Sequence, residues 1–303
     1  MKPAPFDYHA PATLDEAIAL LARLDDEGVD AKILAGGQSL MPMLALRVAR
    51  PEALVDLRKL SALDFIRDEG SHIAIGAMTS KQAAAESALL RAKQPLFHAA
   101  TELIGHIQIR NRGSVGGSFA HADPASEYPA VALALDIEFV AQGPGGRRTI
   151  AAADFFVTYM TTSLEAGEIL TEVRLPAHAP ERRWAIQEFA RRHGDLALAG
   201  VALTLDVQDG RCRNARIAAF GVQATALRLA AAEQALEGRP AQPAHDRGQS
   251  RPAFQVQPGG RPGGFPQPFP SVPSRACRFR PWRPLLRPPQ PARRVAPGRA
   301  GFR

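Results

Sequence analysis

An abrupt change in composition near Ala244 limits how much of this 303-residue chain can fold around a core. The 59 residues that follow hold 13 of the 26 prolines and 12 arginines, but no lysine and no glutamate. Proline removes a main-chain donor and cannot continue a helix, and no hydrophobic period of 2 or 3.6 runs through this stretch. We therefore expect residues 1–244 to carry the fold and residues 245–303 to form an irregular Arg/Pro-rich tail.

The same boundary explains the net charge of +7, because residues 1–244 hold 25 basic and 29 acidic side chains. Three interpretations of the tail stay open. It is a disordered arm that binds anions, a Pro-rich linker, or out-of-frame translation of a GC-rich gene. The first makes an Arg-rich nucleic-acid or polyanion binder on an α+β scaffold the alternative function.

Residues 1–244 show short β-α-β units first and an antiparallel pattern last. Thr13 and Glu16 form a capping box for a helix whose apolar residues recur at helical spacing up to Leu24. The pattern predicts an α+β chain of about three domains. The expected strands lie at residues 29–35, 53–57, 65–67, 72–76, 137–141, 148–150, 169–175, 184–190, 199–207 and 213–220. The other expected helices lie at residues 40–46, 95–105, 124–135 and 227–236, and one more begins at Thr79.

The strongest local motif is a strand that runs into Ala35-Gly36-Gly37-Gln38-Ser39 and then into a helix. A diphosphate needs several main-chain N–H groups pointed at it, and glycine permits that close approach. A second small, glycine-rich loop, Ser114-Val115-Gly116-Gly117-Ser118, follows about eighty residues later. We expect the two loops to present free amides to one diphosphate. Neither loop fits G-x-G-x-x-G or the G-x-x-x-x-G-K-[ST] phosphate loop, and each alone is also compatible with an ordinary turn.

Other chemistries lack residues in suitable patterns. The two cysteines, Cys212 and Cys277, are far apart, and no histidine pair has metal-binding spacing. His121 lies near the second loop, where cofactor contact and a plain structural role are both open. The sequence contains no G-x-S-x-G motif, no signal peptide and no membrane-spanning stretch, so we expect a cytoplasmic protein.

The two loops, their order and their spacing resemble the FAD-binding medium subunit of molybdenum hydroxylases. That family includes the carbon monoxide dehydrogenase medium subunit and the flavin domain of xanthine dehydrogenase. The resemblance spans nearly all of residues 1–240 and none of the tail. Beyond the loops, it rests on the segments 6–9, 53–57, 75–79, 121–130, 167–170 and 192–197.

The resemblance implies a two-domain FAD cradle of the vanillyl-alcohol-oxidase/PCMH type, with subdomains at residues 1–57 and 58–176. A small antiparallel-sheet-plus-helix domain follows at residues 177–244, where we expect it to be truncated. Residues 245–303 lie outside this arrangement.

The resemblance also assigns the FAD-binding residues. Its two loops map to Ile33, Leu34, Ala35, Gly36, Gly37, Gln38, Ser39 and Leu40, and to Ser114, Val115, Gly116, Gly117 and Ser118. The acidic contact to the ribityl chain falls on Glu127, with Asp123 as the nearby alternative, and a leucine near the flavin ring falls on Leu170. Simpler roles stay open for these three residues: a solvated helix face, an N-cap for the helix at Pro124, and strand core, respectively.

The function implied is an FAD-carrying electron-transfer subunit, an oxidoreductase component with no catalytic side chain of its own. It takes electrons from the [2Fe–2S] clusters of a small partner subunit and passes them to an external acceptor, NAD or a quinone. A large partner subunit holds the molybdenum cofactor and selects the substrate. A truncated, non-functional flavoprotein subunit is a further alternative.

Overall fold

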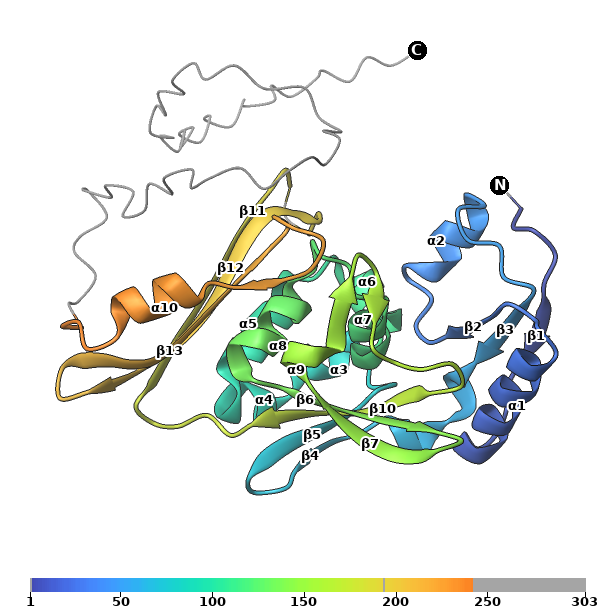
Figure 1. Ribbon diagram of the computed structural model, residues 1–303, viewed down its shortest axis with the longest axis horizontal. Helices are drawn as coiled ribbons and strands as arrows, with labels where there is room; N and C mark the ends of the chain where they lie inside the picture. The colour runs from blue at the N-terminus through green and yellow to red at the C-terminus, as the bar shows by residue number, and fades with distance from the viewer. Residues whose placement is uncertain (1, 193, 242–303) are drawn as a thin grey trace, which may run out of the picture. The chain divides into compact units, whose positions relative to one another are not determined.

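The computed structural model describes residues 2–192 and 194–241, which form three main β-sheets with helices between them (Figure 1). The predicted tail at residues 245–303, and every alternative for it, lies outside the described residues. The α+β architecture predicted for the preceding part is confirmed.

The first sheet is parallel, with strand order β1-β3-β2. The helix α1 packs on it and begins with the predicted capping box, in which the Glu16 amide donates to the Thr13 hydroxyl at 3.2 Å. Its buried face carries Ile18 and Leu21. The elements of this part are β1 (Asp7–His9), α1 (Leu14–Asp26), β2 (Ala31–Leu34), α2 (Leu40–Ala45), β3 (Ala53–Asp56) and the 3-10 turns η1 (Leu57–Lys59) and η2 (Ser61–Leu63).

The second sheet is antiparallel throughout, with strand order β4-β5-β10-β6-β7. The strands expected at residues 65–67 and 72–76 pair in it as one hairpin, and those expected at residues 137–141 and 148–150 pair as another. Its central strand, β10, alternates buried and half-buried residues along its second half, as expected for a strand with one face on the core. The strands are β4 (Ile66–Asp68), β5 (His72–Gly76), β6 (Glu138–Gly143), β7 (Gly146–Ala151) and β10 (Ile169–Pro176).

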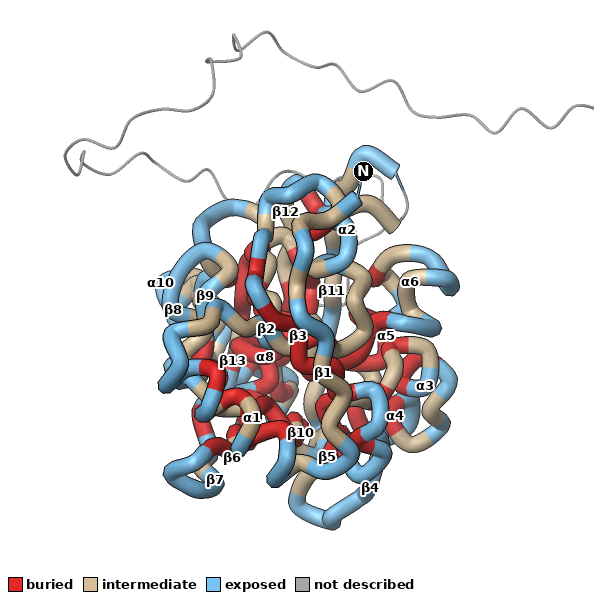
Figure 2. The backbone as a smooth tube through the Cα atoms, turned by 90° about the vertical axis from the view of Figure 1, so that its right-hand side faces the viewer, coloured by how far each residue is buried: buried red, intermediate tan, exposed pale blue. Residues whose placement is uncertain are grey.

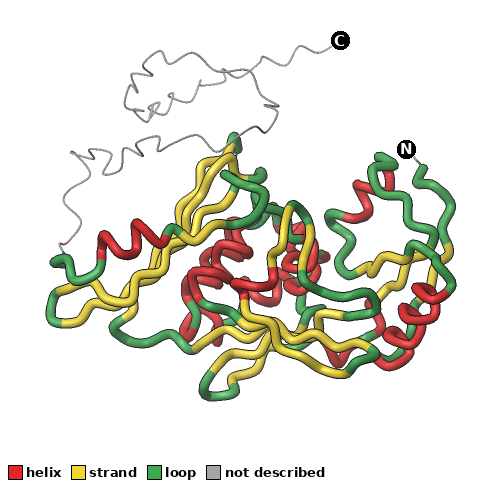
Figure 3. The backbone as a smooth tube through the Cα atoms, in the orientation of Figure 1, coloured by secondary structure: helices red, strands yellow, loops and turns green. Residues whose placement is uncertain are grey.

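Helices fill the space between this sheet and the C-terminal sheet, as Figure 3 shows. The chain makes most of them in the single connection between β5 and β6. They are α3 (Lys81–Glu86), α4 (Ala88–Lys93), α5 (Pro95–Leu103), α6 (Ile107–Arg112), α7 (Val115–His121) and α8 (Glu127–Leu135), and the short α9 (Ala152–Phe155), β8 (Phe156–Thr158) and β9 (Thr161–Thr162) follow β7.

The C-terminal sheet is antiparallel, with strand order β11-β12-β13-β14, and carries one helix. Asp209 and Gly210 form its tight turn with positive φ values of 50° and 68°. The elements are β11 (Arg182–Ala190), β12 (Ala197–Gln208), β13 (Arg211–Phe220), β14 (Leu227–Arg228) and α10 (Ala230–Leu236).

The helix α8 joins the second sheet to the C-terminal sheet through the core. Every one of its nine residues is buried, and the tube at its label is red in Figure 2. Tyr128 stacks on Phe97 and Phe119 at centroid distances of 4.8 and 5.0 Å. From the other side, the Thr204 hydroxyl of β12 donates to the Ala134 carbonyl at 3.0 Å. One hydrophobic core therefore continues from the helical layer into the C-terminal sheet.

Three predicted helix starts were wrong. Thr79 does not open a helix, because its hydroxyl exchanges hydrogen bonds with the main chain of Phe65, and Ser80 caps α3 instead. The helix expected from Pro124 begins at Glu127, because residues 123–126 form a turn. The segment expected as one helix from Leu227 first pairs with β13 as β14.

Candidate cofactor site

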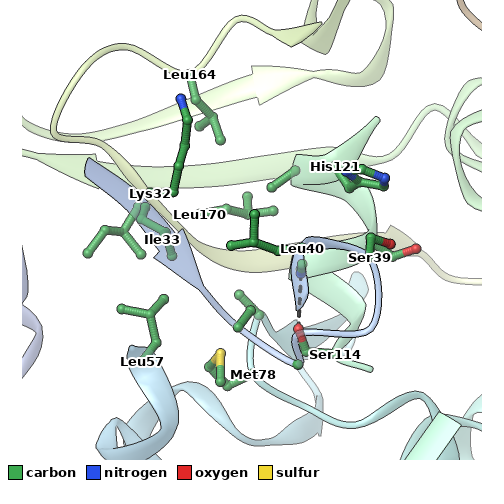
Figure 4. Close-up of a pocket in the computed structure, with 18 of the residues that line it drawn as sticks. Lys32, Ile33, Ser39, Leu40, Leu57, Met78, Ser114, His121, Leu164 and Leu170 are labelled. Atoms are coloured by element: carbon green, nitrogen blue, oxygen red, sulfur yellow. Dashed lines mark hydrogen bonds between the residues drawn. The ribbon is translucent and has the colours of Figure 1, made fainter. Parts of the chain in front are cut away.

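A cavity of about 420 Å³ lies where the first sheet meets the helices and the start of β10. Figure 4 shows residues from all three regions around it. Most of the predicted site residues line this cavity. They are Ile33, Ala35, Gly36, Gly37, Gln38, Ser39, Leu40, Ser114, Gly116, Gly117, Ser118 and Leu170.

The first loop leaves β2 after Leu34 and reaches α2 at Leu40. Gly37 adopts φ +72°, a conformation that an L-residue rarely takes, and the Gln38 side chain donates to the Gly36 carbonyl at 3.2 Å. Within residues 2–192 and 194–241, the main-chain amides of residues 36–39 donate no hydrogen bond. This loop therefore offers free donors at the cavity wall.

The two predicted loops touch through their glycines. A methyl group on Gly36 would lie 2.2 Å from the Arg112 carbonyl oxygen, and one on Gly117 would lie 3.0 Å from the Ala35 Cβ. Neither position has room for a side chain. Segments about eighty residues apart in sequence thus form one continuous wall.

The second loop differs from the prediction, because it is the first turn of α7. The amides of Val115 and Gly116 donate to the carbonyls of Thr79 and Ala77, both at 2.9 Å. The Gly117 amide donates to the Ser114 hydroxyl at 3.1 Å, and the Ser118 amide donates to the Ser114 carbonyl. The expectation that both loops offer free amides was therefore wrong for residues 115–118. Gly116 serves close packing instead, since a methyl group there would lie 2.4 Å from the Ala77 Cβ.

Four predicted residues do not line this cavity. Leu34 and Val115 are buried, Leu34 against Leu44 and Leu54 and Val115 in the main core. Asp123 accepts a hydrogen bond from the Ala125 amide at 2.9 Å, which forms a turn rather than the N-cap of a helix. Glu127 is buried at the start of α8, so it does not lie on a solvated helix face.

The environment of Glu127 favours its neutral form. The pKa of this carboxyl is raised to about 7, mainly by burial and also by the nearby Glu188 carboxylate, whereas Lys81 opposes the shift. Near neutral pH, the Glu127 carboxyl is therefore protonated in part of the molecules and ionised in the rest. The ribityl contact assigned to Glu127 or Asp123 stays a prediction.

Lys81 is a cavity residue that the sequence reading missed. Its side chain is 8% exposed, and its Nζ lies 5.7 Å from the ring centroid of Tyr128. Burial lowers the pKa of this amine to about 8, partly offset by Glu127. A signal was present in the sequence, because helical spacing places Lys81 on the same face as Ala84 and Ala85, which are buried.

His121 also lines the cavity, which is compatible with the cofactor contact that the sequence leaves open beside a structural role. Burial lowers the pKa of the His121 imidazole, Asp123 raises it, and the Lys81 ammonium lowers it further. A neutral imidazole beside a charged Lys81 follows from this arrangement.

The part of the cavity wall before β10 is stabilised by a bidentate ion pair. Arg148 donates from Nε and Nη2 to the two carboxylate oxygens of Glu168 at 2.6 and 2.7 Å. Glu168 also accepts from the Glu165 amide at 2.7 Å, which fixes the turn before β10. This turn places Leu164 and Leu170 at the cavity (Figure 4).

The cavity thus joins free main-chain donors and a buried cation to apolar walls made by Ile33, Leu57, Met78 and Leu170. Such a surface suits a ligand that carries both an anionic group and a flat ring system. Within the described part of the chain, no group of three or more His, Cys, Asp or Glu side chains is placed to hold a metal ion. The described helices also include none with the length and apolarity needed to cross a bilayer.

Two family models match the chain. Residues 4–178 match the FAD binding domain in molybdopterin dehydrogenase, and residues 184–247 match the CO dehydrogenase flavoprotein C-terminal domain.

Known proteins give the same result. The carbon monoxide dehydrogenase medium chain of Hydrogenophaga pseudoflava is 44% identical over 240 residues, which cover 79% of this chain and 82% of the relative. The 6-hydroxypseudooxynicotine dehydrogenase complex subunit alpha of Paenarthrobacter nicotinovorans is 44% identical over 238 residues, 78% of this chain and 79% of the relative. Among solved structures, carbon monoxide dehydrogenase from H. pseudoflava has a TM-score of 0.77 at 45% identity and covers 79% of this chain and 83% of its own.

These matches confirm the predicted cofactor and the two-part FAD fold with its C-terminal domain. The chain belongs to the FAD-binding medium subunits of the molybdenum hydroxylase family, and it is an FAD-dependent oxidoreductase subunit of the carbon monoxide dehydrogenase and xanthine dehydrogenase type.

Proposed function

We propose that this chain carries FAD in the cavity described above and transfers electrons within a molybdenum hydroxylase complex. It receives them from the [2Fe–2S] clusters of a small partner subunit and delivers them to an external acceptor, NAD or a quinone. Bound FAD supplies the redox chemistry, and the residues of the chain hold and orient it.

The observation that carries this proposal is the free-amide loop at residues 36–39 on the wall of the cavity. A diphosphate can accept hydrogen bonds from several amides in one turn, as in other anion-binding loops. The loop fits this group because Gly36 allows close approach to the main chain at Arg112 and Gly37 adopts φ +72°, the shape in which these amides stay free at the cavity wall. The apolar residues Leu164 and Leu170 then provide a surface for the flavin ring.

The remaining site residues take supporting roles in the proposal. A carboxyl at Glu127 or Asp123 binds hydroxyls of the ribityl chain, since a carboxyl group accepts hydrogen bonds in either form and donates one when it is protonated. Leu34 and Val115 do not contact the cofactor, and their buried side chains anchor the two loops to the hydrophobic clusters. Residues 1–57 and 58–176 act as the two halves of the cradle, and residues 177–244 act as the third domain.

The substrate is selected elsewhere in the complex. The two relatives described above share 44% identity with this chain, yet one is named for carbon monoxide and the other for 6-hydroxypseudooxynicotine. A flavin subunit that receives only electrons does not need to contact the substrate. A large subunit with the molybdenum cofactor and a small [2Fe–2S] subunit are therefore the expected partners.

The test is flavin content followed by electron transfer. The purified chain is expected to contain close to one FAD per chain, identified after extraction. The flavin is then expected to bleach when reduced small [2Fe–2S] subunit is added without oxygen, and to recover with NAD or a quinone. A purified, folded chain that takes up no FAD would overturn the proposal. A flavin that the reduced partner cannot bleach would overturn the electron-transfer role alone.

A further inference from the structure

Lys81 is a largely buried cation whose contact with the described part of the chain is the face of the Tyr128 ring, 5.7 Å away. Within residues 2–192 and 194–241, its Nζ makes no hydrogen bond and no ion pair. A charged group with an 8% exposed side chain is costly unless something binds it, and the side chain lines the cofactor cavity. A ligand in that cavity is therefore positioned to pair with the Lys81 ammonium.

Lys81 lies beside the second loop, where most main-chain amides are already bonded. The Lys81 amide donates to the Gly113 carbonyl at 2.8 Å, so the side chain starts directly beside the loop. A methyl group on Gly113 would lie 3.7 Å from the Lys81 Cδ. Four of the five amides of the second loop, those of residues 115–118, are already bonded, so this loop offers fewer free main-chain donors to the cavity than the first loop does.

We propose that the Lys81 ammonium binds an oxygen of the FAD diphosphate, as the counterpart of the free amides of the first loop. This proposal rests on the FAD-binding role proposed above. The first loop supplies neutral donors, and Lys81 supplies a positive charge from the start of α3, beside the second loop. An ammonium is a point donor that suits a phosphate oxygen, and burial strengthens the interaction.

The groups around Lys81 do not neutralise it. On α8, Glu127 lies near enough to favour the ammonium but forms no ion pair with it, and Tyr128 offers only its ring. On α6, Arg110 is bonded to Gln82 and to the carbonyls of Ile104 and Gly105. On α5, His98 is bonded to the Ala85 carbonyl, and on α7, His121 is a base weakened by the same ammonium. Glu188 of β11 acts mainly on Glu127.

The experiment measures the affinity of the apo full-length chain for FAD, ADP and riboflavin. ADP carries the diphosphate without the flavin, and riboflavin carries the flavin and ribityl chain without phosphate. Lys81→Met is expected to weaken FAD and ADP equally, by about 10- to 100-fold, as for the loss of a hydrogen bond to a charged group, and to leave riboflavin unchanged. Lys59→Met, on the exposed turn η1, is the matched control and is expected to bind all three like the wild type.

Three further measurements support the test if Lys81→Met folds poorly. Lys81→Arg retains the charge and is expected to keep most of the affinity. The wild-type affinity for FAD is expected to fall as the pH rises past about 8, where the free amine loses its proton, whereas Lys81→Arg stays constant. The apo form of Lys81→Met is also expected to melt no lower than the wild type, because it no longer buries an unpaired charge.

Three results would overturn the inference. Equal FAD affinity in Lys81→Met and wild type would show a structural lysine. Loss of FAD affinity with unchanged ADP affinity would place the ammonium at the ribityl chain or the flavin ring. Constant wild-type affinity across pH 8 would show that the charge is not used. A wild-type chain that binds no FAD at all would instead overturn the proposed function itself.

Discussion

Gly36 and Arg112 meet main chain to main chain, so closely that a single methyl group on Gly36 would lie 2.2 Å from the Arg112 carbonyl oxygen. Gly36 follows β2 and Arg112 ends α6, so this contact joins the first sheet to the helical layer at the cavity. The obstacle is a carbonyl of the main chain, which cannot rotate away as a side chain can. The cavity wall therefore depends on the absence of one Cβ.

Gly36→Ala is expected to reduce FAD affinity by at least tenfold and to destabilise the chain by about 1–3 kcal/mol, because the two loops must separate. Flavin content after purification and urea unfolding of the apo protein check this. Gly145→Ala is the matched control, because a methyl group there has no neighbour within 4 Å. Normal flavin content in Gly36→Ala would show that the contact between the loops is dispensable.

Ser114→Ala tests the cap of α7. Ser114 accepts from the Gly117 amide at 3.1 Å, and Ser87 accepts from the Leu90 amide at 3.2 Å in α4, away from the cavity. Both alanine variants are expected to lose about 1 kcal/mol of unfolding free energy. Only Ser114→Ala is expected to change FAD affinity, since only Ser114 lines the cavity. Equal FAD affinity in the two variants would remove Ser114 from the site.

The titration of Glu127 is expected to make the stability of the folded chain depend on pH. Its pKa is raised from 4.5 to about 7 in the folded chain, first by burial, so the folded state binds its proton more tightly than the unfolded state does. The stability that this proton contributes is complete below pH 4.5 and is lost as the pH rises through about 7.

Glu127→Gln removes this titration. The apo variant is expected to gain stability over the wild type as the pH rises from about 5 to about 7.5, by up to roughly 3 kcal/mol. Urea unfolding at both pH values measures the difference. Glu181→Gln, at an exposed position, is expected to follow the wild type at both. A constant difference between Glu127→Gln and wild type would mean that Glu127 titrates normally.

Gly200 tests the packing of the C-terminal sheet. It pairs with Phe220 across β12 and β13, and a methyl group on Gly200 would lie 2.1 Å from the Phe220 Cζ. Gly200→Ala is expected to cost about 1–3 kcal/mol of unfolding free energy through overpacking. Adding Phe220→Leu, which shortens the obstructing ring, is expected to recover part of that loss. Additive costs in the double variant would show that the two residues do not compete for space.

Hydrophobic period and turn residues were sufficient to predict most strands, the capped helix α1 and the first glycine loop. These features are local, since a capping box or a glycine after a strand acts within a few residues. The errors at Thr79 and Asp123 share one cause. Each side chain could cap a helix. In the folded chain, however, the Thr79 hydroxyl accepts a hydrogen bond from the Phe65 amide, and Asp123 accepts one from the Ala125 amide within a turn.

The sequence predicted where the site lies, but not which main-chain amides are free in it or that Lys81 lines it. The composition of the second loop gave no sign that its amides are bonded to Ala77 and Thr79, because those partners come from the end of a distant strand. Lys81 was missed for a similar reason. A lysine in a short, polar helix is usually solvated, and only the packing of α8 and the second loop around it makes it buried.

The complete burial of α8 has a consequence for the biogenesis of the chain. The ribosome releases this apolar rod well before it releases the strands of the C-terminal sheet that cover one of its sides. Until those strands are synthesised, the apolar surface of α8 is exposed and can bind chaperones, proteases or another nascent chain. Damage to the last sheet is thus expected to appear first as low yield and degradation, before any change in redox behaviour.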